Sequence, residues 1–317
     1  MDNKFRLLMI SAMYENGGNT VHRFLDGHPQ MFVYPFESQL GTKYVFDHLT
    51  SIFPTKYRWP EFSLDATRQD DYRAVIDEEM KVRTRTPHVS KFRHMPFQMS
   101  DEERLKIFLK LTENESRSRG STVAAYFQAT FQAWRDCVRT GEESIYVGYS
   151  PIVVVDTDKI MRDLSDAHLL HVVRNPWSAY ADTKKRPVPL SLAHYLFGWT
   201  LNQYFALLYK EKYPGRVHIV RLEDVLANSA GALAPICQAL GLEQAASLRY
   251  PSWNGRELEE VFPWGTIRKA NTESNLNTAA ELSAAEIDEV RELAWQYLDT
   301  FDYRTTILNS RSKTART

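Results

Sequence analysis

Short apolar runs alternate with longer mixed segments near the start of the chain. Residues 5–11 form the first run, and a loop with Gly17 and Gly18 separates it from residues 19–28, whose apolar side chains share one helical face. Residues 31–34 follow as a second short strand. A short run that is apolar throughout is typical of a buried parallel strand, so this segment predicts a strand–helix–strand unit.

The same alternation returns after residue 144. The predicted strands are residues 145–147, 168–173 and 217–221, and the predicted helices are residues 156–164, 176–185, 191–212 and 231–240. A last helix over 283–298 begins with capping-box spacing at Ser283. Strands that alternate with helices predict an α/β fold with a central parallel sheet flanked by helices.

Residues 40–140 follow a different pattern. Charge-rich stretches over 101–111 and 122–138 predict a mostly helical insertion that covers one face of the sheet. The basic segment 90–94 predicts a solvated loop.

No linker rich in Pro, Gly or Ser divides the chain, and no internal repeat is present. We therefore expect residues 1–317 to form a single domain, with a flexible polar tail over 309–317.

Composition narrows the classes of protein. Lys plus Arg number 39 and Asp plus Glu number 40, which gives a net charge of −1 and no reason to expect nucleic acid as a partner. Hydrophobic residues make up 43% of the chain, enough to bury a core, and no apolar run is long enough for a membrane span. Two cysteines and a start without a signal peptide predict a cytoplasmic protein with reduced thiols.

The loop between the first predicted strand and helix carries the first candidate site. It contains Asn16, Gly17, Gly18, Asn19 and Thr20. Glycines expose consecutive backbone N–H groups and a helix N-terminus adds partial positive charge, so this loop is an anion cradle suited to phosphate or sulfate. Thr20 either caps the helix or donates its hydroxyl to the anion. A plain turn with a helix cap is the alternative, and the lysine of the nucleotide-binding P-loop pattern is absent.

Two sets of cations are candidates for phosphate binding. Arg174 follows the apolar strand 168–173, at the sheet edge where open α/β sheets bind ligands, and its guanidinium can hold a phosphate through two hydrogen bonds. The alternative is an arginine paired with a surface carboxylate. Arg268 and Lys269 are adjacent in a late loop, where they either hold a phosphate, with Trp264 stacked on a base, or are simply solvated.

These features, in this order, resemble the family of sulfotransferases that use 3′-phosphoadenosine 5′-phosphosulfate (PAPS). The similarity spans roughly residues 5–275. Its four places are the loop and the helix that ends at 21–30, Arg174-Asn175-Pro176, Arg221-Leu222-Glu223-Asp224 with the helix after it, and Trp253-Asn254-Gly255 leading to Arg268-Lys269.

The resemblance implies a P-loop-like sulfotransferase fold and the transfer of a sulfuryl group from PAPS to a hydroxyl or amine, without a metal. It implies that residues 16–20 hold the 5′-phosphosulfate. It further implies that Arg174, with Ser178 or Thr183, holds the 3′-phosphate and that Arg268 and Lys269 close over it.

The chain departs from the family pattern at three points. Tyr14 and Glu15 stand where the family loop carries a lysine or arginine, and Asp182 falls where the family has a serine eight residues after the arginine. Another lysine of many bacterial members is also missing before the strand that ends at Arg174. A replacement cation would have to come from Lys184, Lys185 or Arg186.

Glu37 is the candidate general base. It follows the second predicted strand, which puts it beside the loop in a βαβ arrangement, and a carboxylate there could take the proton of an attacking acceptor. The alternative is that Glu37 caps a helix over residues 39–49.

The acceptor is expected to be a small molecule, such as a natural product modified by a tailoring enzyme, or a saccharide. The 40–140 insertion is expected on the acceptor side. Four aromatics there either line a pocket or form core, with core favoured: Tyr57, Trp59, Tyr126 and Trp134. A P-loop-type kinase and a nucleotide-binding protein without transfer activity remain alternative functions. The oligomeric state is not predicted.

Overall fold

The computed structural model describes residues 5–259 and 271–304. Its centre is a five-stranded sheet with the order β2-β3-β1-β4-β5, in which all neighbouring strands are parallel. The strands are β1 (Leu7–Ala12), β2 (Met31–Val33), β3 (Ile145–Tyr149), β4 (Ala167–Val173) and β5 (Val217–Arg221). The predicted parallel α/β fold and all five predicted strands are therefore confirmed.

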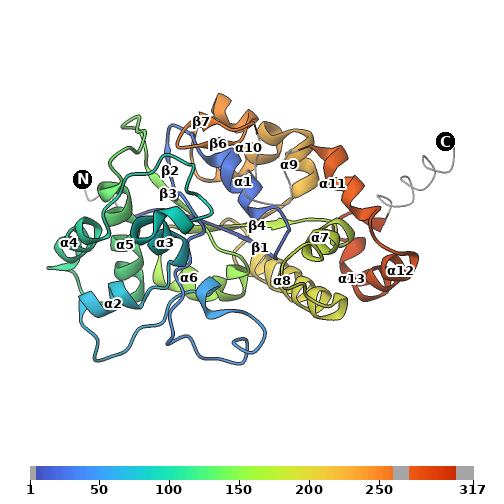
Figure 1. Ribbon diagram of the computed structural model, residues 1–317, viewed down its shortest axis with the longest axis horizontal. Helices are drawn as coiled ribbons and strands as arrows, with labels where there is room; N and C mark the ends of the chain where they lie inside the picture. The colour runs from blue at the N-terminus through green and yellow to red at the C-terminus, as the bar shows by residue number, and fades with distance from the viewer. Residues whose placement is uncertain (1–4, 260–270, 305–317) are drawn as a thin grey trace.

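Helices cover both faces of the sheet (Figure 1). Alternate residues of β1 face opposite cores, because side chains along a strand point to opposite sides. Leu8 and Ile10 pack against α1 (Gly18–Leu25), α9 (Leu222–Ala227) and α10 (Ser229–Ala239). Leu7 and Met9 belong to the larger core, to which α5 (Arg119–Ala133), α6 (Thr157–Asp163) and α8 (Leu192–Lys212) contribute.

The insertion is helical only in its second part. Its helices are α2 (Arg68–Ala74), α3 (Glu78–Arg85), α4 (Asp101–Thr112) and α5. The predicted helices at 101–111 and 122–138 correspond to α4 and α5. Residues 34–54 contain no helix, so the alternative in which Glu37 caps a helix over 39–49 is wrong.

A buried ion network fixes the irregular segment after β2. The guanidinium of Arg58, 1% exposed, contacts the Asp156 carboxylate at 2.7 Å and that of Asp47 at 2.7 Å. Asp156 also accepts a hydrogen bond from the backbone N–H of Trp59. Breaking such a network would leave an unpaired buried charge, which is costly. The network therefore fixes Arg58 and, with it, the preceding residues 55–57.

The C-terminal helices pack on other helices of the fold. Helix α11 (Thr272–Ala279) packs on α7 (Pro176–Thr183), and α12 (Ala284–Leu293) and α13 (Trp295–Leu298) follow. A small hairpin of β6 (Ser252–Trp253) and β7 (Arg256–Glu257) turns at Asn254 and Gly255, whose φ angles are 51° and 74°. Positive φ at both central residues is what the tight hairpin turn requires, and Asn-Gly supplies it.

Several sequence predictions lie outside the described residues: the phosphate-binding roles of Arg268 and Lys269, the stacking of Trp264, and the tail 309–317. Among the residues that the structure describes, none of the helices has the length and apolar character that crossing a membrane requires.

Gly41 permits a close backbone contact that supports the segment carrying Lys56 and Tyr57. Its N–H donates to the carbonyl of Lys56 at 3.2 Å, and a Cβ at this position would lie 1.7 Å from the carbonyl oxygen of Thr55. We predict that Gly41→Ala lowers the free energy of unfolding by about 3 kcal/mol, because the backbone must move to admit the methyl group.

Urea unfolding measures this effect, with Gly215→Ala as the matched control. A Cβ at Gly215 would meet nothing within 4 Å, so that variant should change stability by less than about 1 kcal/mol. Equal effects of the two substitutions would contradict the role given to Gly41.

Candidate functional site

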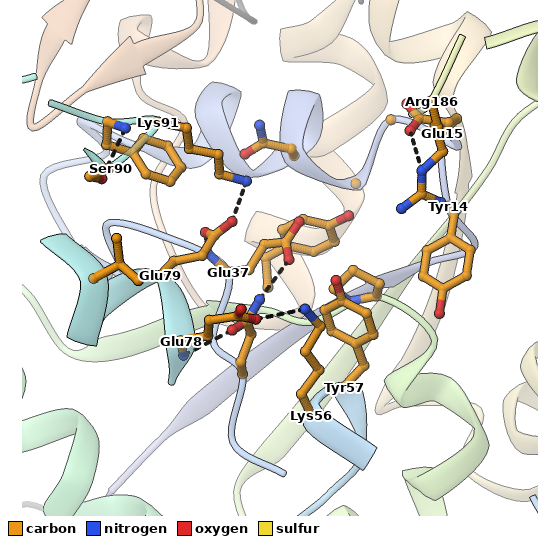
Figure 2. A pocket seen from close by; sticks show the side chains of 18 of the residues that line it. Tyr14, Glu15, Glu37, Lys56, Tyr57, Glu78, Glu79, Ser90, Lys91 and Arg186 are labelled. Carbon is orange, nitrogen blue, oxygen red and sulfur yellow. Dashed lines mark hydrogen bonds and ion pairs between the residues drawn. The ribbon is translucent and has the colours of Figure 1, made fainter. Parts of the chain in front are cut away.

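A cavity of about 550 Å³ opens at the carboxyl ends of β1, β2 and β3. Segments that follow each of these strands contribute to it: residues 14–15 and 17–19 after β1, Glu37 after β2 and Pro151 after β3. The insertion and the residues that follow α7 complete the wall (Figure 2). This is the edge at which open α/β sheets bind their ligands.

The loop after β1 presents backbone N–H groups at the start of α1. Glu15 and Gly17 have φ angles of 59° and 82°, which turn the chain sharply before Gly18 begins the helix. No side chain among the described residues caps this helix end, and the N–H groups of a first turn have no partner within the helix. Gly17, Gly18 and Asn19 line the cavity. The loop therefore places an uncapped helix start at the cavity, and its role as an anion cradle stays a prediction.

Gly18 allows the loop to lie close to the sheet. A Cβ at this position would lie 2.4 Å from the Tyr149 ring and 2.8 Å from the side chain of Ala12. A larger residue would push the start of α1 away from β1 and β3, so the glycine sets the depth of the cradle.

Asn16 anchors the loop from inside the protein. Its side chain is fully buried, and its Oδ1 accepts hydrogen bonds from the backbone N–H of Arg174 at 3.1 Å and the indole of Trp199 at 3.1 Å. Its Nδ2 donates to the hydroxyl of Tyr195 and to the carbonyl of Tyr14. With every polar atom of its side chain engaged, Asn16 holds the loop rather than lining the cavity.

Thr20 lies beneath the cradle. Its side chain is 1% exposed, and its hydroxyl has no hydrogen-bond partner in the structure. A buried hydroxyl without a hydrogen-bond partner is costly, and Thr20 is not among the residues that line the cavity.

The cavity wall carries four carboxylates and four cations, and every cation has an acidic partner. Lys56 pairs with Glu78 at 2.7 Å, and Lys91 pairs with Glu79. On the other side, Lys185 pairs with Asp182 and Glu281, and the Nε of Arg186 lies 3.9 Å from Glu15. The local charge is therefore as balanced as that of the whole chain.

The structure shows which of the three cations after α7 reach the cavity. Of the three that sequence alone left open, Lys185 and Arg186 line the cavity. Lys184 instead forms an ion pair with Glu286 at the start of α12.

Arg174 is buried behind the loop and does not line the cavity. Its Nη1 donates to the Asp182 carboxylate at 2.7 Å and to the carbonyl of Glu15 at 2.7 Å, and its Nε donates to Asn275 on α11. The paired-arginine alternative therefore describes its contacts, although the partner carboxylate is buried and not on the surface.

The two hydroxyls considered beside Arg174 are also buried. Thr183 Oγ1 donates to the carbonyl of Ala179 at 3.0 Å, while Ser178 Oγ has no partner. Neither of them lines the cavity.

Glu37 lines the cavity together with a second carboxylate, Glu79 at the start of α3. The backbone N–H of Glu37 donates to Glu79 Oε2 at 3.1 Å, and Gln39 donates to the Glu37 carboxylate at 3.2 Å. Figure 2 shows Lys91 reaching Glu79 next to Glu37. Burial, with the nearby Glu37 charge as a second cause, raises the pKa of Glu79 to about 7 despite Lys91.

Aromatic and aliphatic side chains form the rest of the wall. Tyr14, Tyr57, Tyr149 and Phe92 face the cavity. Of the four aromatics singled out in the insertion, Trp59, Tyr126 and Trp134 belong to the core, as favoured, whereas Tyr57 is a cavity residue.

Sequence reasoning missed the contribution of the insertion to the charged wall. Lys56, Glu78 and Glu79 carried no motif. Segment 90–94 was predicted to be a solvated loop, but Ser90 and Phe92 are buried and Lys91 lines the cavity. In the sequence, the apolar Phe92 between Lys91 and Arg93 is the signal that could have indicated a partly buried wall segment.

A parallel α/β sheet with a glycine loop at the start of a helix is an arrangement that many proteins use to bind anionic ligands at the strand ends. Residues 10–246 match the sulfotransferase family, so the chain belongs to that family.

The fold agrees with that of a solved sulfotransferase domain. The sulfotransferase domain of the olefin synthase from Synechococcus PCC 7002 is 15% identical, with a TM-score of 0.53 and coverage of 94% of this chain and 96% of that domain. Sulfotransferase STF9 from Mycobacterium avium is 14% identical, with a TM-score of 0.48 and coverage of 94% of this chain and 77% of that protein. No curated protein sequence matches the chain.

The raised pKa of Glu79 makes stability depend on pH. The folded protein holds the proton of Glu79 up to about pH 7, above the usual value of 4.5, so folding becomes less favourable as pH rises through this window. We predict that the stability of Glu79→Gln relative to wild type increases by about 3 kcal/mol between pH 4.5 and pH 8.

Urea unfolding at a series of pH values checks this, with the exposed Glu113→Gln as the control whose difference from wild type should stay constant. A Glu79→Gln difference that is also flat over this range would show that Glu79 is ionised in the folded protein well below pH 7.

Proposed function

We propose that the protein transfers a sulfuryl group from PAPS to a hydroxyl or amine of a small molecule, such as a natural product, or of a saccharide. The observation that carries this proposal is that the anion cradle at Gly17–Asn19 and the Glu37 carboxylate line one cavity. A sulfuryl transfer needs a bound phosphosulfate and a base for the acceptor proton within reach of one another.

The phosphosulfate end of the donor fits the residues present. The uncapped first turn of α1 offers N–H groups to an anion, and Thr20 in the same turn has a buried hydroxyl without a partner. When bound, the donor supplies an activated sulfuryl group whose leaving group is a phosphate. The loop amides would orient that phosphate.

The charge that builds up on the leaving oxygen needs a cation, and the family loop lysine is absent. Lys185 and Arg186 line the cavity and take this role in our proposal. Their present partners are carboxylates, Asp182 and Glu281 for Lys185 and Glu15 for Arg186. An incoming phosphosulfate would compete with Glu15, whose pKa is raised by burial and which is therefore easier to protonate next to an anion.

Glu37 is the proposed general base. As the acceptor oxygen or nitrogen bonds to sulfur, the bond from sulfur to the bridging phosphate oxygen breaks and the acceptor proton passes to the Glu37 carboxylate. The hydrogen bond from Gln39 orients that carboxylate. The ion pair of Glu79 and Lys91 lies beside Glu37 and places a proton-binding carboxyl group and a cation next to the proposed base.

The proposed acceptor site is the part of the cavity toward the insertion. Tyr57, Phe92 and Val82 give it an apolar wall, while Lys56 and Glu78 give it a polar side. A volume of about 550 Å³ lies within the usual range for small-molecule sites, which supports a small acceptor or the end of a saccharide.

The desulfated product, adenosine 3′,5′-bisphosphate (PAP), should stabilise the protein. A ligand at one hundred times its dissociation constant adds about 2.7 kcal/mol to the free energy of unfolding, so we expect a rise of several degrees in Tm at millimolar PAP. Thermal unfolding followed by fluorescence measures this. Absence of a shift with PAP, together with magnesium-dependent ATP turnover, would instead favour the kinase alternative.

Substituting the proposed base should abolish transfer while leaving nucleotide binding intact. Glu37→Gln keeps the shape of the side chain but cannot accept the acceptor proton, so we expect kcat to fall by a factor of about 100 or more with little change in the PAP dissociation constant. Transfer of ³⁵S from labelled PAPS to a panel of small hydroxylated and amino compounds measures kcat.

Glu142→Gln, an exposed change of the same kind, is the control and should leave the rate unchanged. Transfer by Glu37→Gln at the wild-type rate would exclude Glu37 as the base. Nucleotide binding without transfer by wild type to any compound in the panel would favour the non-catalytic alternative.

A further inference from the structure

The guanidinium that the family resemblance assigns to the 3′-phosphate is already neutralised inside the protein. Arg174 is fully buried, and the Asp182 carboxylate that contacts its Nη1 at 2.7 Å is 1% exposed. Nη1 also donates to the Glu15 carbonyl, and Nε donates to Asn275. Only Nη2 is buried without a partner.

A second buried carboxylate stands behind the same group. Asn275 links Arg174 to Glu223, because its Oδ1 accepts from Arg174 while its Nδ2 donates to Glu223 at 3.1 Å. Glu223 is 8% exposed and accepts further hydrogen bonds from Asn175 and from the hydroxyl of Tyr303. One arginine therefore faces two carboxylates in a region closed off by α11.

A phosphate dianion is unsuited to this environment. Like charges in contact within a buried site repel each other strongly, and an ion that leaves water must find a partner to offset its lost hydration. Asp182 already provides the negative partner of Arg174. A 3′-phosphate at this position would add two charges beside Asp182 and Glu223 and would gain at most the partnerless Nη2 and the partnerless hydroxyl of Ser178.

We propose that Asp182 occupies, as an internal anion, the position that the donor's 3′-phosphate takes in the family, so that the protein binds adenosine 5′-phosphosulfate donors without reading a 3′-phosphate through Arg174. This rests on the proposed function and widens its donor class to adenosine 5′-phosphosulfates with or without a 3′-phosphate. Asp182 is thereby a specificity-determining residue, and Arg174 is a positioning residue that holds the loop carbonyl of Glu15.

The contacts of Asp182 support a structural role for its ion pair with Arg174. Its Oδ1 lies 3.2 Å from the Nζ of Lys185, which lines the cavity, while its Oδ2 holds Arg174 behind the loop. A serine at this position would leave Arg174 without its anion and Lys185 with Glu281 alone. The carboxylate therefore links the back of the cradle to a cation at its front.

The test compares two nucleotides that differ only in the 3′-phosphate. Dissociation constants for AMP and PAP are measured by calorimetry on wild type, on Asp182→Ser, and on the double variant Arg174→Gln/Asp182→Asn, which removes both charges and leaves no unpaired ion. The quantity of interest is the ratio of the AMP constant to the PAP constant.

We expect a wild-type ratio below about 5. In Asp182→Ser the ratio should rise by about tenfold or more, because Arg174 becomes free for a phosphate. In the double variant the ratio should stay within about threefold of wild type. A ratio that falls by more than about threefold in the double variant would show that Arg174 reads the 3′-phosphate. A wild-type ratio above about 5 would show that the donor site selects nucleotides with a 3′-phosphate. Either result overturns the inference.

The double variant keeps the test open if Asp182→Ser does not fold. Binding of neither nucleotide to wild type would overturn the proposed function, and the inference with it. Binding of PAP with a strong preference over AMP would leave the proposed function intact and overturn the inference alone.

Discussion

The site depends on one buried arrangement, in which Asn16 and Arg174 hold the loop after β1 from inside. Asn16 accepts the backbone N–H of Arg174 at the end of β4, and Arg174 returns a hydrogen bond to the carbonyl of Glu15. These contacts join the ends of two adjacent strands and fix the left-handed residues that precede α1. Because the loop is held from behind, its N–H groups are left to face the cavity.

Charge balance is the second constraint. The chain has a net charge of −1, and the cavity repeats this neutrality through ion pairs in which each cation is already matched. A polyanionic ligand would therefore exchange partners rather than fill a positive pocket. The backbone N–H groups of the loop are hydrogen-bond donors that no carboxylate already occupies. For binding an anion, the first turn of α1 therefore matters more than the number of lysines.

Much of the fold could be predicted from sequence because periodicity reports directly on burial. All five strands and the helices at 157–163, 192–212 and 229–239 follow from apolar runs and helical faces. Helices α9 and α11 carried weaker patterns and were not predicted. Residues 39–49 looked compatible with a helix, but the ion pair of Asp47 with the buried Arg58 holds that region in an irregular path.

The site was only partly predictable, since motifs report on residues that are close in sequence. The glycine loop and Glu37 follow strands and could be placed at one edge of the sheet. Lys56, Glu79 and Lys91 reach the cavity through the tertiary path of the insertion, which no local pattern encodes. Arg174 was recognised by position, but the buried Asp182 and Glu223 around it become evident only when α7, α9 and α11 are assembled.

The central claim is that the backbone of the loop after β1 binds the phosphate of the donor. A crystal structure of the protein with PAP tests it most directly. The account predicts that the 5′-phosphate lies within hydrogen-bonding distance of the N–H groups of Gly18 and Asn19, with Arg174 still paired to Asp182. A 5′-phosphate held by the lysines of the insertion, away from the start of α1, would contradict it.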